Sequence, residues 1–164
     1  DGTAESTEPE KEKTDSLTFE EEQRQRTEKY AAEQNAKRDE IAEEVIRLTN
    51  AEREKAGLNP LEMDDSLMKA ADVRVKEMGE SFSHTRPDGS KYITAAQEAG
   101  YSGSYVGENG SAGKSTAEYI VSSWMNSEGH RENILNPNYN YIGVAYNYNI
   151  GSEYGSYCVQ IFAR

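Results

Sequence analysis

The order of the hydrophobic patterns along this chain limits its fold more than any other feature. Helical periods come first, and strand-like runs close the chain. Two tyrosine-rich runs, 141–147 and 154–162, are separated by the turn sequence Asn149-Ile150-Gly151-Ser152, and together they predict an antiparallel hairpin. Helices followed by strands indicate an α+β fold and argue against a doubly wound sheet, in which the two kinds of element alternate.

Four helices are predicted before this hairpin, over residues 38–57, 64–78, 93–99 and 115–124. Gly57 ends the first helix, while Asp64 and Thr116 are good N-cap residues for the second and the last. Spacings of three and four residues define one apolar face on each of the three longer helices, formed by Ile41, Val45 and Leu48, by Leu67, Ala71, Val75 and Met78, and by Ala117, Ile120, Val121 and Trp124. We therefore expect the single tryptophan to be a core residue.

The net charge of the chain, −12 with a pI near 4.7, argues against two classes of partner. Nucleic acids need Lys and Arg for their phosphates, and anionic membrane surfaces attract the same residues. No apolar run approaches the roughly 20 residues of a membrane span. The sequence thus predicts a protein with no nucleic-acid partner and no transmembrane segment.

The acidity is concentrated in the first forty residues, which predict a tail. Residues 1–16 have almost no apolar content and are expected to be disordered, whereas 17–37 are rich in helix formers and read as a helical spacer. We divide the chain into an acidic, partly helical tail or linker, 1–37, and a domain, 38–164. Because the chain begins at Asp1, we expect a processed protein from which a signal peptide has been removed.

The single cysteine, Cys158, excludes an intramolecular disulfide and a thiolate-rich zinc site. It stands in the last predicted strand, where a buried structural thiol is expected. The only two histidines, His84 and His130, stand in loop and turn sequence with an arginine and an acid near each. Glu108 lies between glycines in what reads as a loop. No HExxH, CxxC or EF-hand pattern is present, so spacing alone leaves open whether these are exposed loop residues or a site.

Four motifs in order along the chain, SHTRPDG, GENG, WMNSEGHRENILNPNYNYIGVAY and YCVQIFAR, resemble those of the CAP superfamily. This superfamily, also called the SCP domain, includes cysteine-rich secretory proteins, antigen 5 and plant pathogenesis-related proteins. Residues 50–78 are similar to the first two helices of its bacterial secreted branch. The resemblance runs from about Arg38 to the C-terminus and leaves the tail outside it.

The resemblance implies a three-layer α-β-α sandwich with a central antiparallel sheet and an open groove. In the family, two histidines and two acids face each other across that groove. The first histidine corresponds to His84, the acid of the Gly-Glu-Asn motif to Glu108, and the second histidine to His130. The position of the remaining acid, three residues after the tryptophan, is Ser127 here, and Glu128 is its neighbour. The disulfides of many eukaryotic members cannot form.

Three functions are consistent with this reading. The first is a secreted or surface-tethered bacterial CAP domain, associated with the cell envelope, that binds a polar ligand, either peptide-like or a glycan, or a divalent metal. The second is a metal-dependent, protease-like hydrolase, in which His84 and His130 hold Zn²⁺ or another divalent ion and Glu108 or Glu128 acts as general base. The third is a signalling domain cut from a precursor, with the tail as its protease-sensitive part.

Overall fold

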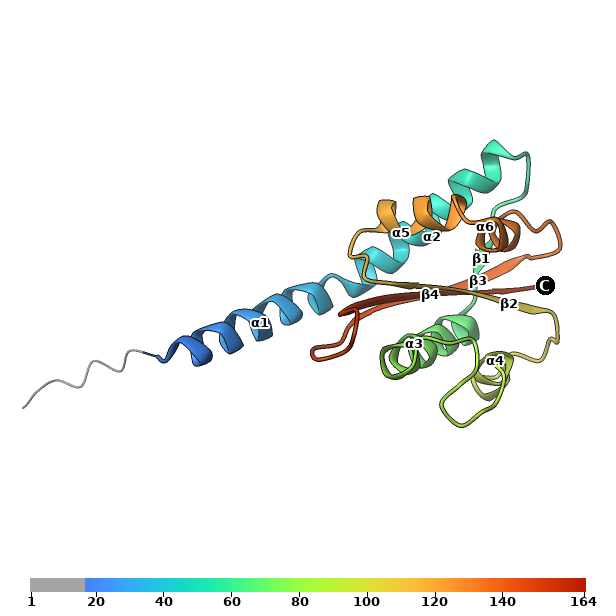
Figure 1. The fold of residues 1–164 in the computed structure, drawn as a ribbon. Helices are drawn as coiled ribbons and strands as arrows, with labels where there is room; N and C mark the ends of the chain where they lie inside the picture. The colour runs from blue at the N-terminus through green and yellow to red at the C-terminus, as the bar shows by residue number, and fades with distance from the viewer. Residues whose placement is uncertain (1–16) are drawn as a thin grey trace, which may run out of the picture.

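The protein is a three-layer sandwich whose middle layer is a four-stranded sheet in the order β1-β3-β4-β2. The computed structural model describes residues 17–164, and the predicted disordered segment 1–16 lies outside the described residues. Figure 1 shows helices α2, α5 and α6 on one face of the sheet and α3 and α4 on the other. The predicted α+β class and α-β-α layering are therefore confirmed. The strands are Glu62–Met63 (β1), Val106–Ala112 (β2), Tyr141–Tyr148 (β3) and Ser156–Ala163 (β4).

The predicted C-terminal hairpin is present, and it supplies the two central strands. β3 pairs antiparallel with β4, with Tyr141 opposite Ala163, and β4 pairs antiparallel with β2, with Glu108 opposite Ile161. The connection between β3 and β4 covers residues 149–155, so the turn is longer than the predicted tetrapeptide. The two-residue strand β1 runs parallel to β3, which makes the sheet mixed at that edge only.

The helices agree with the predicted ranges, and two of the caps form as expected. The side chains of Asp64 and Thr116 accept hydrogen bonds from the N–H groups of Leu67 and Tyr119. A helix that the pattern did not predict, α6, follows directly after α5. The bounds are Arg38–Lys55 (α2), Asp65–Glu80 (α3), Ile93–Glu98 (α4), Ala117–Met125 (α5) and Glu128–Ile134 (α6).

Two apolar clusters hold the layers together, one on each face of the sheet. Trp124 belongs to the cluster beneath α2 and α5, and its indole N–H donates to the Gly110 carbonyl at 3.0 Å. Cys158 is fully buried in the same cluster, and burial raises the pKa of its thiol. The tryptophan is thus a core residue and the cysteine a structural thiol, as predicted.

Helix α1, Phe19–Ala36, projects from the domain and contacts it through its C-terminal part (Figure 1). It starts with a capping box between Thr18 and Glu21. Near its end, the Asn35 amide donates to the Tyr148 carbonyl at 3.0 Å and accepts from the Tyr148 N–H at 2.9 Å. The predicted helical segment is therefore joined to the end of β3, while the division of the chain at residue 38 stays a prediction.

Arg53 joins α2 to the segment between α6 and β3. Its side chain is 1% exposed and donates to four backbone carbonyls, those of Asn59, Ile134, Asn136 and Tyr139, at 2.8–3.3 Å. We expect Arg53→Met to lower the free energy of unfolding by about 3 kcal/mol, because the buried carbonyls lose their donors. The melting temperature should fall by roughly 6–12 °C.

The control for this prediction is Lys55→Met on the same helix. The Lys55 side chain is 70% exposed, and within residues 17–164 it pairs only with Glu52, so its loss should change stability by less than about 0.5 kcal/mol. Equal melting temperatures for the two variants would contradict the structural role given to Arg53.

Candidate functional site

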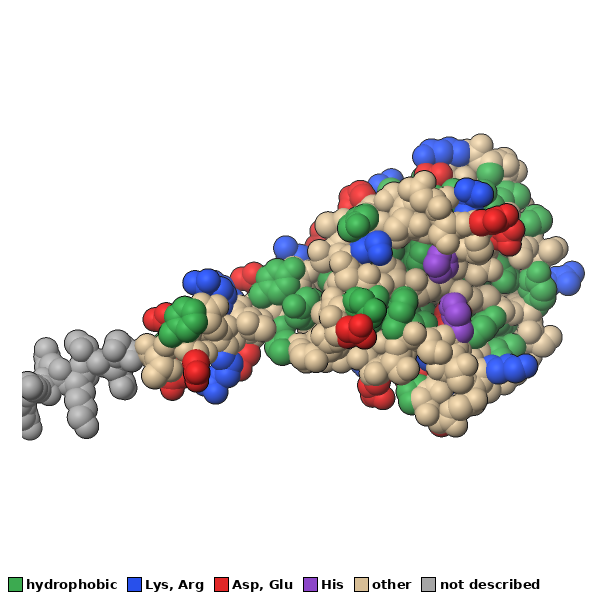
Figure 2. Space-filling view, in the orientation of Figure 1, with side chains coloured by type: hydrophobic (Ala, Val, Ile, Leu, Met, Phe, Trp, Pro, Cys, Tyr) green, Lys and Arg blue, Asp and Glu red, His purple; other side chains and the backbone are tan. Residues whose placement is uncertain are grey.

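The two histidines come from different layers of the sandwich and meet at the edge of β2. His84 lies in the loop after α3, and His130 lies on α6. Both line one cavity of about 180 Å³, together with Met78, Phe82, Ser83 and Gly110. Figure 2 shows the two imidazoles side by side on one face of the molecule. His84 is in a loop as expected, whereas the expected turn at His130 is a helix.

Glu108 is not a loop residue, and this corrects the interpretation made from its flanking glycines. It lies in the middle of β2, is 4% exposed, and points its carboxylate at α3. Arg74 donates to both carboxylate oxygens, from Nε at 2.7 Å and from Nη2 at 3.0 Å. This bidentate contact is a strong ion pair that fixes the orientation of both side chains.

Arg74 is a site residue that the sequence pattern did not identify. Its side chain is fully buried on α3, and it also donates to Glu77 at 2.6 Å and to the Ser83 carbonyl at 2.7 Å. The available signal was its position: Arg74 is three residues after Ala71 and four before Met78, on the apolar face of the helix. A charged residue at such a position needs a buried partner.

His84 is held by the same carboxylate. Its Nδ1 lies 2.9 Å from Glu108 Oε1, and because a carboxylate only accepts, the ring nitrogen is the donor. The hydrogen bond with Glu108 raises the pKa of His84, against the opposing effect of burial. The charged form of His84 is therefore favoured.

His130 has the opposite environment. Its Nδ1 lies 2.9 Å from the Ser127 hydroxyl, which is neutral. Burial lowers the pKa of His130, and the nearby charges of His84 and Lys114 lower it further. The groove thus has a histidine with a raised pKa on one wall and a histidine with a lowered pKa on the other.

Ser127 and Glu128 are separated by the start of α6. Ser127 occupies the N-cap position and points to His130, so it takes the place of the second acid of the family pattern. Glu128 is exposed in the first turn of the helix. Within residues 17–164, no hydrogen bond or ion pair joins Glu128 to His84, Glu108 or His130. The structure therefore brings together three of the four predicted residues, with Ser127 beside them.

The donor set does not fit a resident zinc ion. A catalytic zinc site has three protein ligands and a water, but both oxygens of Glu108 are already engaged by Arg74 and one also by His84. Two imidazoles remain, and across residues 17–164 no three His, Cys, Asp or Glu side chains are grouped to hold a metal.

The loop that carries His84 is fixed to the helices beside it. Arg86 turns away from the groove and donates to Glu77 at 2.9 Å and to Glu98 at 2.9 Å. These contacts, led by Glu77, raise the pKa of Arg86 further. Since Glu77 also pairs with Arg74, one chain of ion pairs connects α4, the loop and the floor of the groove.

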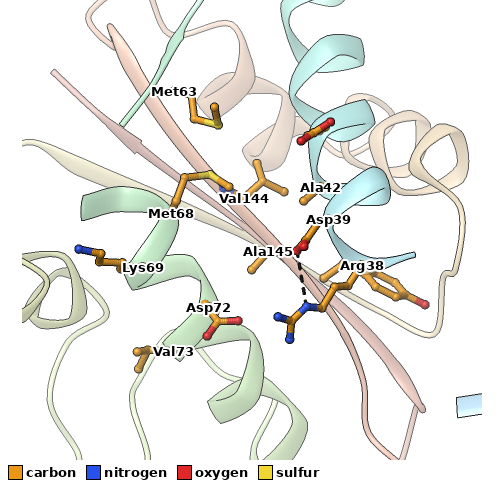
Figure 3. Close-up of a pocket in the computed structure, with 12 residues that line it drawn as sticks. Arg38, Asp39, Ala42, Met63, Met68, Lys69, Asp72, Val73, Val144 and Ala145 are labelled. Atoms are coloured by element: carbon orange, nitrogen blue, oxygen red, sulfur yellow. Dashed lines mark hydrogen bonds and ion pairs between the residues drawn. The ribbon is translucent and has the colours of Figure 1, made fainter. Parts of the chain in front are cut away.

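A larger cavity, about 620 Å³, lies at the opposite edge of the sheet, between α2, α3 and β3. Figure 3 shows Met63, Met68 and Val144 around it, with Arg38 and Asp39 paired at its rim. Its lining contains neither histidine and no residue of the Arg74–Glu108 network. Size favours this cavity, but the groove at β2 has the oriented polar groups that recognition and chemistry require.

A sandwich whose groove carries two histidines and a buried acid defines a class of α-β-α domains. Residues 46–162 match the CAP family, the cysteine-rich secretory protein family, and the chain belongs to it. The uncharacterized protein YkwD of Bacillus subtilis is 45% identical over 104 residues, which are 62% of this chain and 40% of that protein. The chain therefore spans about two fifths of this relative.

Two solved structures are similar in fold. An extracellular protein containing an SCP domain from Bacillus anthracis superposes with a TM-score of 0.68 at 28% identity, over 77% of this chain and 41% of that one. An outer surface protein of Borrelia burgdorferi superposes with a TM-score of 0.67 at 25% identity, over 75% of this chain and 91% of its own. The resemblance read from the motifs is thus confirmed for family and fold.

The opposed environments of the histidines predict separate titrations. We expect His84 to titrate above 6.5, its ordinary pKa, and His130 below it, as measured from the imidazole proton signals by NMR. Glu108→Gln should bring the pKa of His84 down, whereas Glu128→Gln, the matched control, should leave it unchanged. A His84 that titrates below 6.5 would contradict the geometry.

The sign of the stability effect follows from the raised pKa of His84. The contribution of His84 to the free energy of unfolding is fully present below pH 6.5, and it is lost as the pH rises through the pKa of His84 in the folded protein. Relative to His84→Gln, the protein should therefore lose stability as the pH rises through that range. Urea unfolding at several pH values measures this difference.

Proposed function

We propose that this domain is the binding module of a bacterial envelope protein, and that the groove at β2 holds a polar ligand, peptide-like or a glycan. One observation carries the proposal. Two imidazoles face a common cavity, each fixed through Nδ1, and within residues 17–164 neither Nε2 has a partner. Polar groups that are oriented in advance and left unpaired favour a ligand that supplies the missing hydrogen bonds.

Aromatic side chains beside the histidines support this role. Phe82 is 48% exposed and lines the cavity, and its ring lies 6.1 Å from that of Tyr154, which is also 48% exposed. Tyr92 packs edge-on against His84 at 6.0 Å. Aromatic side chains offer a large apolar contact surface, the tyrosines add a hydroxyl group, and both residue types are common where proteins bind ligands.

The location outside the cell is part of the proposal. Two structural relatives are described as an extracellular protein and an outer surface protein. Within residues 17–164, every helix is too short or too polar to cross a bilayer. The acidic helix α1 would then act as a spacer between the domain and the envelope.

A hydrolase that uses the same groove is the second candidate. The opposite pKa shifts of the two histidines favour it. A neutral His130 can accept a proton and a charged His84 can donate one, which is the pairing that acid–base catalysis needs. A divalent ion that entered the groove would have the Nε2 atoms of His84 and His130 as its protein ligands. Only the metal-dependent form of the hydrolase needs that ion.

The binding proposal predicts a loss of affinity in groove variants. We expect chitin oligosaccharides or short peptides to bind the protein, and His84→Ala with His130→Ala to abolish that binding because both facing groups are lost. Calorimetric titration with each probe measures the affinity, and a melting curve verifies the fold. The control is Lys69→Gln at the opposite cavity, which should bind normally.

The products of the same incubations separate the two candidates. Unchanged probes after long incubation with the wild-type protein support a binding module. If the wild-type protein cleaves a probe, and His130→Ala loses this cleavage with an unchanged melting temperature, the protein is a hydrolase and the binding-module proposal is wrong. Wild-type protein that binds no probe contradicts the binding proposal.

Zinc gives a separate test of the donor set. We expect Zn²⁺ to bind metal-free protein weakly and the His84→Ala, His130→Ala double variant not at all, because two imidazoles are an incomplete ligand set. Calorimetry measures both. Tight one-site binding would show that a third ligand joins the histidines. It would contradict the conclusion that the groove offers zinc only two protein ligands.

A further inference from the structure

β2 is an edge strand that reaches the groove at Gly110, and its register with β4 sets the direction of its backbone groups. Gly113 donates to the Ser156 carbonyl, and the odd-numbered residues of β2 before it form the hydrogen-bonded pairs with β4. The even-numbered residues, Val106, Glu108, Gly110 and Ala112, therefore direct both their N–H and C=O groups away from β4.

The carbonyls on this edge already have donors from side chains. Tyr92 donates to Val106 at 3.0 Å, Asn133 to Glu108 at 3.3 Å and Trp124 to Gly110 at 3.0 Å. The donors come from three different segments, α4 and its N-cap, α6 and α5. The edge thus offers no free acceptor at these positions.

The N–H groups of the same edge have no such partners. Gly110 is buried and lines the cavity with both histidines. Across residues 17–164, no side chain or backbone carbonyl accepts a hydrogen bond from the Gly110 N–H. A buried backbone donor without a partner is rare, and it implies that water or a ligand supplies the acceptor.

The charges around this donor favour an anion. Glu108 is neutralised by Arg74 at 2.7 Å, so the one buried carboxylate beside the cavity leaves little net negative charge. Lys114, just beyond the end of β2, and His84 both act on His130 as positive charges. Exposed Glu128 is the acid nearest along α6, and within residues 17–164 it forms no ion pair with Lys114, His84 or His130.

We propose that the groove binds its ligand through a carboxylate and that the Gly110 N–H is the anchoring donor. The oxygen atoms would lie between Gly110 and the two histidines, with Lys114 adding long-range attraction. This rests on the proposed function, because it names the ligand chemistry of the same groove. The terminal carboxylate of a peptide and a free small acid share this chemistry.

The size of the cavity limits the group that carries the carboxylate. A volume of about 180 Å³ corresponds to roughly six water molecules, enough for a carboxylate with one small side chain. Gly110 keeps that space open. A Cβ at this position would lie 3.1 Å from Met78 Cε and 3.3 Å from Phe82 Cε2 and would narrow the cavity.

The test is NMR titration of ¹⁵N-labelled protein at constant ionic strength with three probes: acetate, N-acetylalanine and the neutral N-acetylalanine methylamide. We expect both carboxylates to move the Gly110 amide signal saturably and downfield, and the methylamide to leave it in place. Binding of N-acetylalanine at least about fivefold more tightly than acetate would identify a peptide terminus, since the alanine methyl and the amide add contacts that acetate lacks. Equal affinities would identify a small free acid.

Variants make the assignment specific. Gly110→Ala should weaken N-acetylalanine binding at least about tenfold by filling the cavity, and Lys114→Gln should weaken it less. Lys69→Gln removes the same charge beside the opposite cavity and should change nothing. Because Gly110→Ala touches the ends of two core side chains, its melting curve is compared with that of the wild type, and Lys114→Gln is the variant that leaves the core untouched.

The outcomes separate this inference from the proposed function. If carboxylates leave Gly110 unmoved, or the methylamide moves it equally, while an oligosaccharide or a peptide still binds through the histidines, the carboxylate inference is overturned and the binding module stands. If no probe of any class binds, both are overturned.

Discussion

The buried ion pair between Arg74 and Glu108 is the interaction on which the groove depends. Both side chains are removed from water, so neither charge is tolerable without the other. The pair joins α3 to β2. Arg74 also donates to the Ser83 carbonyl, and this hydrogen bond positions the loop that carries His84. The position of the first histidine and the rise in its pKa thus follow from the contacts of Arg74 and Glu108.

The asymmetry of the groove comes from the different environments of its two histidines. Glu108 gives His84 a charged partner, whereas Ser127 gives His130 a neutral one. A carboxylate at position 127 would favour the charged form of both rings and leave two cations facing each other. The serine avoids that repulsion and leaves one ring able to accept a proton, so the groove can offer a donor and an acceptor together.

Local patterns were enough to predict most of the fold. The capped amphipathic helices and the tyrosine-rich hairpin are specified by residues near each other in sequence, and they formed as expected. β2 was missed because its glycines carry little strand propensity, and it is a strand only through its register with β4. α6 was missed because it is short and contains Gly129.

The site was predictable in part. Family motifs selected His84, Glu108 and His130; in the structure the two histidines line one cavity, and Glu108 binds His84. Pattern alone could not show that Glu108 is buried, because its partner Arg74 is 34 residues away. The choice between Ser127 and Glu128 depended on where α6 begins, which sets one side chain toward the groove and the other toward solvent.

The capped edge of β2 also affects how copies of this domain behave when crowded. An open edge strand invites a neighbouring chain to add to the sheet. Here a second chain would first have to displace Tyr92, Asn133 and Trp124 from the carbonyls they already occupy. These three side chains therefore protect the edge against polymerisation, so copies of the domain at high local density would keep their grooves open.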